Sequence, residues 1–183
     1  MATTVEVIAD AMKAAGTPFI TGHPGGETVE LMDAACKRDM RFLLFKQETA
    51  AAMMAATWGE ITGSPGLCVS TRGPGATNMV NGVAYASLDR APLIAMTDQY
   101  GPATYATGLR QRMNQLAIYA PLVKWGTTIN AQVVRHQMWK ALRVATAAPP
   151  GPVHFEMPQT ETTREASDYA VEPPLLANQI DIE

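Results

Sequence analysis

The feature that most constrains the fold is a regular alternation of short apolar runs with longer helical stretches. The apolar runs have the length and composition of buried strands and lie at residues 18–21, 41–45, 66–71, 92–97 and 152–157. Helical patterns cover residues 3–16, 28–37, 48–61, 76–88 and 131–147. This order predicts a three-layer, doubly wound α/β domain with a mainly parallel sheet and helices on both of its faces. Residues 98–120 carry few clear signals and are expected to be irregular.

The helical stretches carry their own boundary and burial signals. Thr3 and Glu6 have the spacing of a capping box that opens the first helix, and Gly16 closes it. Three helices are expected to bury one apolar stripe each. The stripes are Val5, Ile8, Ala9 and Met12 in the first helix, Val29, Leu31, Met32 and Ala35 in the second, and Val133, Val134, Met138, Leu142 and Val144 in the last.

Glycine-rich or polar loops follow three of the expected strands, at residues 22–26, at residues 72–75 and after Thr97. In an open parallel sheet, ligands bind at the carboxyl ends of the strands. We therefore expect these loops to gather on one edge of the sheet and to form its functional edge.

Composition excludes several classes of protein. The chain has 183 residues, of which 47% are hydrophobic and 17% charged, so it should fold as one domain of ordinary size. The net charge of -3, the pI near 5.6 and the absence of a basic run argue against nucleic-acid binding. Cys36 and Cys68 stand apart from each other and from any metal-binding spacing, and no signal peptide or membrane-spanning run is present. A reduced cytoplasmic location follows as the default expectation, with no membrane partner.

Two glycine-rich segments stand at the expected functional edge. GHPGGE (22–27) and STRGPGATN (70–78) each join a strand to a helix. The second segment reads GxGxxN, so it is not the dinucleotide fingerprint, and without a following GK[ST] it is not a P-loop. From the residues alone two interpretations remain open: an anion at the helix N-terminus, or glycines that only let the helix pack closely on the sheet.

Glu48 follows the strand at 41–45 and begins a helix of small residues. One interpretation is a favourable charge at a helix N-terminus, which stabilises by about 0.3–1 kcal/mol. The other starts from the small and apolar residues at 50–56, which indicate a helix packed on most sides. An acid at the start of such a helix is withdrawn from water, which suits proton exchange with a bound base.

The order and spacing of these motifs resemble the N-terminal pyrimidine-binding domain of the acetolactate-synthase-like thiamine-diphosphate enzymes. That group includes benzoylformate, sulfopyruvate and phosphonopyruvate decarboxylases. The motifs are GHPGGE at 22–27, QE at 47–48, and AAAMMAATWGEITGSPGLCVSTRGPGATNMVNGVAYASLDRAPLIAMTDQ at 50–99. The resemblance continues through PLVKW (121–125) and PGPVHFEMP (150–158), so it covers residues 3 to about 158.

The resemblance implies a role for each matching residue. Glu48 would hydrogen-bond N1′ of the cofactor's aminopyrimidine ring and so help to activate the thiazolium carbon that attacks a 2-keto acid. Residues implied to build the pyrimidine pocket and the subunit interface are Gly25, Gly26, Glu27, Gly73, Pro74, Gly75 and Asn78. Gln111 falls where similar enzymes carry a glutamine that faces the active site. His23 and Arg72 depart from the family's small or apolar residues and are assigned to the substrate side, with a neutral surface difference as the alternative.

The same resemblance implies missing parts. Similar enzymes bind the diphosphate and Mg²⁺ through a second domain with a GDG motif, and no GDG occurs in these 183 residues. We therefore expect no metal site here, a diphosphate-binding domain or subunit in trans or C-terminal to this chain, and at least a homodimer. FAD is possible, and the chain alone is expected to be inactive. The small residues at 50–56 and 76–84 are expected to suit a symmetric interface.

Residues 1–158 are expected to form the pyrimidine-binding domain, and residues 159–183 a linker or tail. Pro173 and Pro174 resemble the start of an interdomain linker, which favours a fragment of a longer enzyme over a subunit of a split one. The alternative function is a non-catalytic dimerisation or nucleotide-binding module of the same fold. His136 and His154 are expected to be structural.

Overall fold

The computed structural model describes residues 1–25 and 28–167. Six strands form one sheet in the order β2-β1-β3-β4-β6-β5, and all neighbouring strands are parallel. Their bounds are β1 Phe19–Gly22, β2 Arg41–Leu44, β3 Gly66–Ser70, β4 Leu93–Gln99, β5 Trp125–Thr128 and β6 Pro152–Pro158. The predicted α/β class with a parallel sheet is confirmed.

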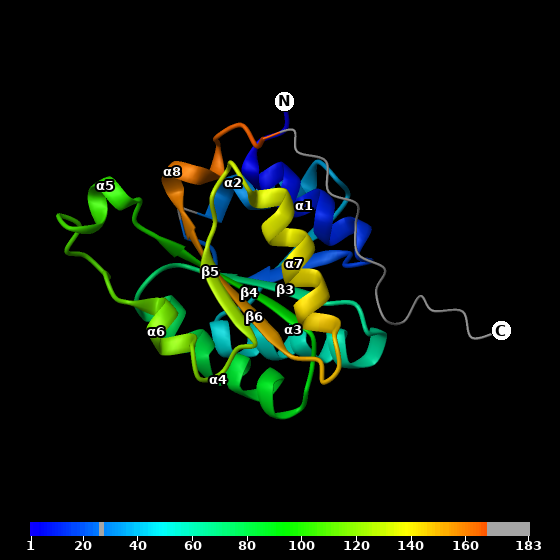
Figure 1. Cartoon of the computed structure of the whole chain (residues 1–183). Coiled ribbons are helices and arrows are strands. Elements are labelled where there is room, and N and C mark those ends of the chain that lie inside the picture. Colours follow the sequence, from blue (N-terminus) through cyan, green and yellow to red (C-terminus); the bar gives the residue numbers. More distant parts are fainter. Residues whose placement is uncertain (26–27, 168–183) are drawn as a thin grey trace.

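Helices cover both faces of the sheet, which gives three layers (Figure 1). One face is covered by α1 (Thr4–Ala14), α2 (Val29–Cys36) and α7 (Val134–Thr146), and the other by α3 (Glu48–Thr62), α4 (Pro74–Leu88) and α6 (Gln115–Tyr119). Two short helices, α5 (Pro102–Tyr105) and α8 (Gln159–Thr162), lie outside these layers. Each face of the sheet therefore has its own hydrophobic core.

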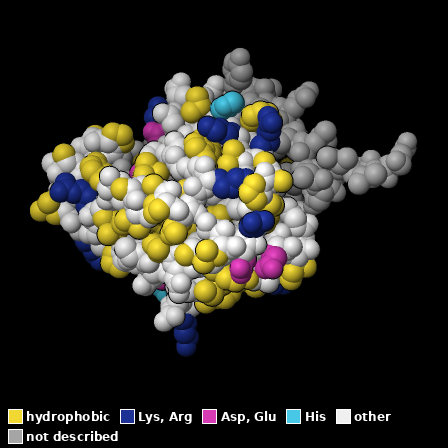
Figure 2. Space-filling view, turned by 60° about the horizontal axis from the view of Figure 1, so that its bottom comes forward, with side chains coloured by type: hydrophobic (Ala, Val, Ile, Leu, Met, Phe, Trp, Pro, Cys, Tyr) yellow, Lys and Arg dark blue, Asp and Glu magenta, His cyan; other side chains and the backbone are white. Residues whose placement is uncertain are grey.

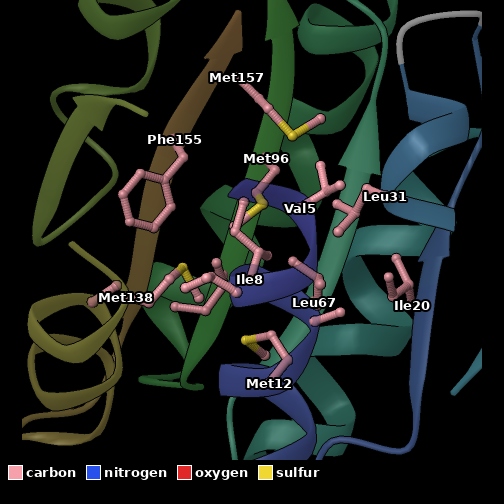
Figure 3. Close-up of a cluster of buried hydrophobic side chains, with 14 of the residues drawn as sticks. Val5, Ile8, Met12, Ile20, Leu31, Leu67, Met96, Met138, Phe155 and Met157 are labelled. Atoms are coloured by element: carbon pink, nitrogen blue, oxygen red, sulfur yellow. The ribbon is translucent and has the colours of Figure 1, made fainter. Parts of the chain in front are cut away.

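The larger core lies between the sheet and α1, α2 and α7. Val5, Ile8 and Met12 of α1 are buried against the sheet, as their spacing predicted (Figure 3). The capping box of Thr3 and Glu6 is present at the start of this helix. Capping and an apolar stripe thus point to the same helix, and that agreement favours a single folded state.

Two of the predicted helix faces were partly wrong. Val29 is 53% exposed, because α2 buries the stripe of Leu31, Ala34 and Ala35 instead. Val133 is 49% exposed, because it lies at the N-cap of α7 and outside its buried stripe. A helix that packs on one side buries only residues about three and four apart, and both valines lie off that stripe.

Residues 98–120 are more regular than expected. Strand β4 continues through Asp98 to Gln99, and both side chains are buried. The segment also contains α5 and α6. Strand β5 had no counterpart in the prediction, since it is a half-exposed strand at the edge of the sheet and has a weak apolar signal.

The segment after β6 contacts the start of the chain. Glu165 forms a bridge with Thr3, and Ala166 is buried in the larger core. The division at residue 158 stays a prediction, and Pro173 and Pro174 lie outside the described residues. In the described part of the chain, no helix is long and apolar enough to cross a membrane. No group of three or more His, Cys, Asp or Glu residues within 1–25 and 28–167 could hold a metal ion.

Candidate functional site

The candidate site lies where the strands of the parallel sheet end. Because all strands run in one direction, the loops after β1, β3 and β4 lie at the same edge. Helices α3 and α4 begin at this edge, with Glu48 in the first turn of α3 and residues 72–75 leading into α4. The edge that the glycine-rich loops predicted is therefore the edge at which Glu48 lies.

Glu48 is almost fully withdrawn from water, with 6% of the residue exposed. Its Oε2 accepts a hydrogen bond of 3.2 Å from Nδ2 of Asn78 in α4. The Thr49 hydroxyl donates to the Asn78 carbonyl, which adds a second link between the two helix starts. Both interpretations of Glu48 thus agree with its position: it lies in the first turn of a helix, and it is buried.

Gly75 lies close beside this carboxyl. A Cβ atom at Gly75 would lie 3.1 Å from Oε1 of Glu48 and 2.6 Å from Oγ1 of Thr71. Any other side chain at this position would therefore crowd the acid and the Thr71 hydroxyl.

The turn before α4 depends on a second glycine. Gly73 has a φ of +67°, and a Cβ there would lie 2.6 Å from the carbonyl oxygen of Gln111. Pro74 follows at the first helical position, where its fixed φ favours helix initiation. The Gly73 N–H donates to Oε1 of Gln115 over 3.0 Å. Glycine is required at this position for its conformation as well as for space.

Arg72 is buried in an ion pair. Its Nη1 lies 2.6 Å from Oδ2 of Asp98, and its guanidinium lies 4.0 Å from the ring centroid of Tyr100. Gln111 is exposed, has a φ of +60° and contacts Gly73 through its backbone. Arg72 therefore links the turn at 72–75 to the end of β4.

The loop after β1 is held by polar contacts. His23 is exposed, and its Nδ1 lies 2.8 Å from the Phe45 carbonyl oxygen, across from the end of β2. The Gly25 N–H donates to the Thr28 hydroxyl over 3.2 Å. Gly26 and Glu27 lie outside the described residues.

Sequence analysis missed a buried polar cluster behind the turn at 72–75. It contains Gln115, Tyr119, Thr97 and His154, each 0% exposed. Burial lowers the pKa of His154 to about 3, so the ring is uncharged at neutral pH. Burial raises the pKa of Tyr119, which keeps its hydroxyl protonated as a donor. The only available signal was the spacing of Gln115 and Tyr119 four residues apart, which places them on one helix face.

Cys68 lies in β3 below the site. Burial raises the pKa of its thiol to about 12, so the thiol stays protonated at neutral pH. A protonated, buried thiol is a poor nucleophile. The site therefore offers Glu48 rather than a cysteine for chemistry.

Fold and site together define a class: a parallel α/β domain that presents a buried carboxyl at a helix N-terminus, beside a glycine turn, on its ligand-binding edge. Residues 2–118 match the family described as "Thiamine pyrophosphate enzyme, N-terminal TPP binding domain". The chain belongs to this family, and the predicted resemblance is confirmed.

The proteins to which this chain is similar are longer than the chain itself. A probable acetolactate synthase large subunit of Methanocaldococcus jannaschii is 36% identical over 155 residues, which are 84% of this chain and 26% of the relative. Acetolactate synthase isozyme 2 large subunit of Escherichia coli is 32% identical over 83% of this chain and 28% of the relative. The acetolactate synthase large subunit of Lactococcus lactis is 31% identical over 89% of this chain and 29% of the relative. The chain thus spans little more than a quarter of the length of these relatives.

Proposed function

We propose that this chain is the pyrimidine-binding part of a thiamine-diphosphate-dependent enzyme that acts on a 2-keto acid, by decarboxylation or by acetolactate-type carboligation. The observation that carries the proposal is the buried Glu48 carboxyl with its Oε2 held by Asn78 and its Oε1 beside Gly75. The family match and the names of the relatives support the same cofactor class.

The residues present fit an aminopyrimidine ring. A buried acid needs a partner, because an isolated charge in a low dielectric is costly. Asn78 satisfies Oε2, and the lack of a side chain at Gly75 leaves Oε1 uncrowded from that side. The Glu48 carboxyl has one oxygen hydrogen-bonded to Asn78 and the other beside Gly75. Through this second oxygen it can share a proton with a ring nitrogen.

In this proposal each residue has a defined task. Glu48 holds a proton at Oε1 for the pyrimidine nitrogen N1′, and Asn78 fixes the orientation of the carboxyl. Gly73 and Gly75 allow the turn to approach the ring, and exclusion of water strengthens the hydrogen bond to it. Bound thiamine diphosphate supplies the nucleophilic carbon and the electron sink for the 2-keto acid. His23, Arg72 and Gln111 belong to the substrate side of the same edge.

The diphosphate and Mg²⁺ are assigned to another domain or subunit, since this chain has no GDG motif. Relatives about four times as long as the aligned region support a second part of this kind. FAD, if present, is likewise assigned to that other part. Below, "assembled enzyme" denotes this chain together with the domain or subunit that supplies the diphosphate site.

We propose that the domain or subunit that supplies the diphosphate site contacts the outer side of α3 and α4. The exposed large apolar residues on these two helices are Met54, Ile61 and Leu88. Ile61 and Leu88 are 79% and 82% exposed, and Met54 is 38% exposed. Figure 2 turns this side of the molecule forward and shows hydrophobic side chains spread across it. Exposed apolar surface of this kind marks interaction sites. Most of the small residues at 50–56 and 76–84 that were expected at an interface are instead buried inside the chain's own core, namely Ala51, Ala52, Ala55, Ala56 and Ala76, whereas Ala50 is exposed.

Replacing Glu48 tests the proposal. In the assembled enzyme, Glu48→Gln keeps the size of the side chain and removes the exchangeable proton. We expect kcat for a 2-keto acid, with pyruvate tried first, to fall by about a hundredfold or more. The circular dichroism spectrum should not change.

The matched control is Glu60→Gln, which removes an acid that lies on the same helix, is exposed and accepts a hydrogen bond from Tyr85. It should leave kcat within about twofold. Unchanged turnover in Glu48→Gln would contradict the proposal and favour a non-catalytic dimerisation or nucleotide-binding module.

A further inference from the structure

Helix α6 places a fully buried glutamine directly behind the pyrimidine turn. Oε1 of Gln115 accepts from the Gly73 N–H over 3.0 Å. Its Nε2 donates to the Thr97 hydroxyl over 3.1 Å and to the Asp98 carbonyl over 2.9 Å. One neutral side chain thus joins the turn at 72–75 to the end of β4 through three hydrogen bonds.

The other end of α6 holds the first turn of α4. The Tyr119 hydroxyl donates to the Ala76 carbonyl over 2.5 Å. The Tyr119 ring stacks on His154, with 4.1 Å between the centroids. His154 Nε2 lies 2.9 Å from Oγ1 of Thr97, which also accepts from Gln115. Gln115 and Tyr119 are therefore two ends of one buried network.

We propose that Gln115 and Tyr119 are positioning residues of the pyrimidine site. Within residues 1–25 and 28–167, the side chains of Gln115 and Tyr119 form no hydrogen bond with Glu48. They act through Gly73 and Ala76, which lie on either side of Gly75. Helix α4 begins at this turn and contains Asn78, whose side-chain amide donates to the Glu48 carboxyl. Helix α6 thereby sets the position of the turn at 72–75 and of Asn78 relative to Glu48. The inference rests on the proposed function, since it gives that site two further residues.

A purely structural role is the competing explanation, and the chain offers a matched control for it. Gln137 of α7 is also buried, accepts from the Asn130 N–H over 3.0 Å and donates to the Thr128 carbonyl over 2.7 Å. It lies on the opposite face of the sheet from α6. Its loss removes the same kind of hydrogen bonds without touching the turn at 72–75.

The experiment compares Gln115→Leu with Gln137→Leu in the assembled enzyme, with the Kd of thiamine diphosphate measured by calorimetry in the presence of Mg²⁺. We expect Gln115→Leu to weaken binding by about ten- to a hundredfold, because it leaves the Gly73 N–H and the Asp98 carbonyl without this partner. Gln137→Leu should bind as the wild type does. Tyr119→Phe keeps the stack on His154 and should weaken binding by about three- to tenfold.

Gln115→Glu adds a readout that a structural role would not move. The ionised carboxylate accepts from Gly73 but cannot donate, whereas the protonated acid can do both. The titratable and charged groups in or beside this network are Tyr119, His154 and Asp98, with its ion-pair partner Arg72. Cys68 and Glu48 also act on Tyr119 electrostatically. We expect the ratio of the variant's Kd to the wild-type Kd to fall toward one as pH is lowered, while Gln137→Glu shows no such trend in this ratio.

Each outcome decides the inference. Equal losses in Gln115→Leu and Gln137→Leu, or no loss in either, would overturn it. If the wild-type enzyme binds no thiamine diphosphate, the proposed function fails instead. Hydrogen exchange of the Gly73 amide then still tests the hydrogen bond between Gln115 and Gly73. We expect faster exchange of this amide in Gln115→Leu, which has lost the acceptor, but not in Gln137→Leu. Wild-type protection of this amide in Gln115→Leu would overturn the inference as well.

Discussion

His154 illustrates how burial of one residue makes stability depend on pH. It lies in β6 with 0% exposure, and burial lowers its pKa from 6.5 to about 3. Between these two values the unfolded chain binds a proton at this ring and the folded chain does not. The free energy of unfolding must therefore fall as pH decreases from about 6.5 toward 3.

We expect this residue alone to contribute a slope of up to about 1.4 kcal/mol per pH unit in that window. His154→Gln removes the titration and keeps a hydrogen-bonding group for Thr97. Urea unfolding at a series of pH values should show a shallower acid loss in this variant. His136→Gln, at an exposed position of α7, is the control. A slope for His154→Gln equal to that of the wild type would contradict the assignment.

At the residue scale, the sequence alone was enough to select the candidate site residues that lie in ordered motifs. Glu48, Gly73, Gly75 and Asn78 lie in glycine-rich or helix-start segments whose spacing is informative, and the structure brings these four together. Gln115 could not be found in that way. A polar residue buried by distant partners has no local pattern, because its three hydrogen-bond partners lie 17, 18 and 42 positions away.

At the scale of elements, the pair of α3 and α4 carries the site. The Asn78 side chain contacts Glu48 near one end of the pair, and the Tyr85 hydroxyl donates to Glu60 over 3.2 Å near the other. Between them, Gly82 lets the helices approach closely. A Cβ there would lie 2.5 Å from Cβ of Ala52 and 2.7 Å from the Thr49 carbonyl oxygen.

Gly82→Ala should force the two helices apart. We expect the free energy of unfolding to fall by about 1–3 kcal/mol from overpacking, less up to about 1 kcal/mol for the better helix propensity of alanine. Urea denaturation measures this change. Asn81→Ala, at an exposed position of the same helix, should be neutral or slightly stabilising. An increase in the free energy of unfolding in Gly82→Ala would contradict this prediction, because it would show that α3 and α4 can accommodate the added methyl group.

Elements with strong, sustained patterns were predictable, and those without were not. Helix α3 was expected at 48–61 and is Glu48–Thr62, since its start, its small residues and Gly63 all agree. Strand β5 was missed because the sheet covers little of it at the edge. Tertiary contacts, more than local propensity, decide such short elements.

At the scale of the whole molecule, the two faces of the sheet differ in what covers them. Ile61 of α3 and Leu88 of α4 are exposed, on the side where we propose that the partner binds. On the opposite side, α1 and α7 lie over the larger core. A charge placed in a buried interface without a counter-charge is costly, whereas on a free surface it is tolerated.

Leu88→Glu should therefore weaken assembly without unfolding the chain. Sedimentation velocity of the assembled enzyme should show a shift to smaller species, with a corresponding loss of turnover at low protein concentration. Val133→Glu, on the opposite side of the sheet, is the control and should leave the sedimentation pattern unchanged. Sedimentation of Leu88→Glu identical to that of the wild type would place the interface elsewhere.

The segment at 100–114 is fastened at both of its ends. Before it, Gln99 of β4 donates to Glu156 over 2.9 Å, and after it comes the buried Gln115. The residues between these anchors are mostly exposed and contribute little to either core. We expect the exposed residues of such a segment to tolerate changes in length and in side chain. The end anchors, together with the contacts of Tyr100 with Arg72 and of Gln111 with Gly73, keep the acid and the glycine turn in place. In the proposed enzyme, changes in this one loop would then alter the substrate preference and leave the buried residues around Glu48 as they are.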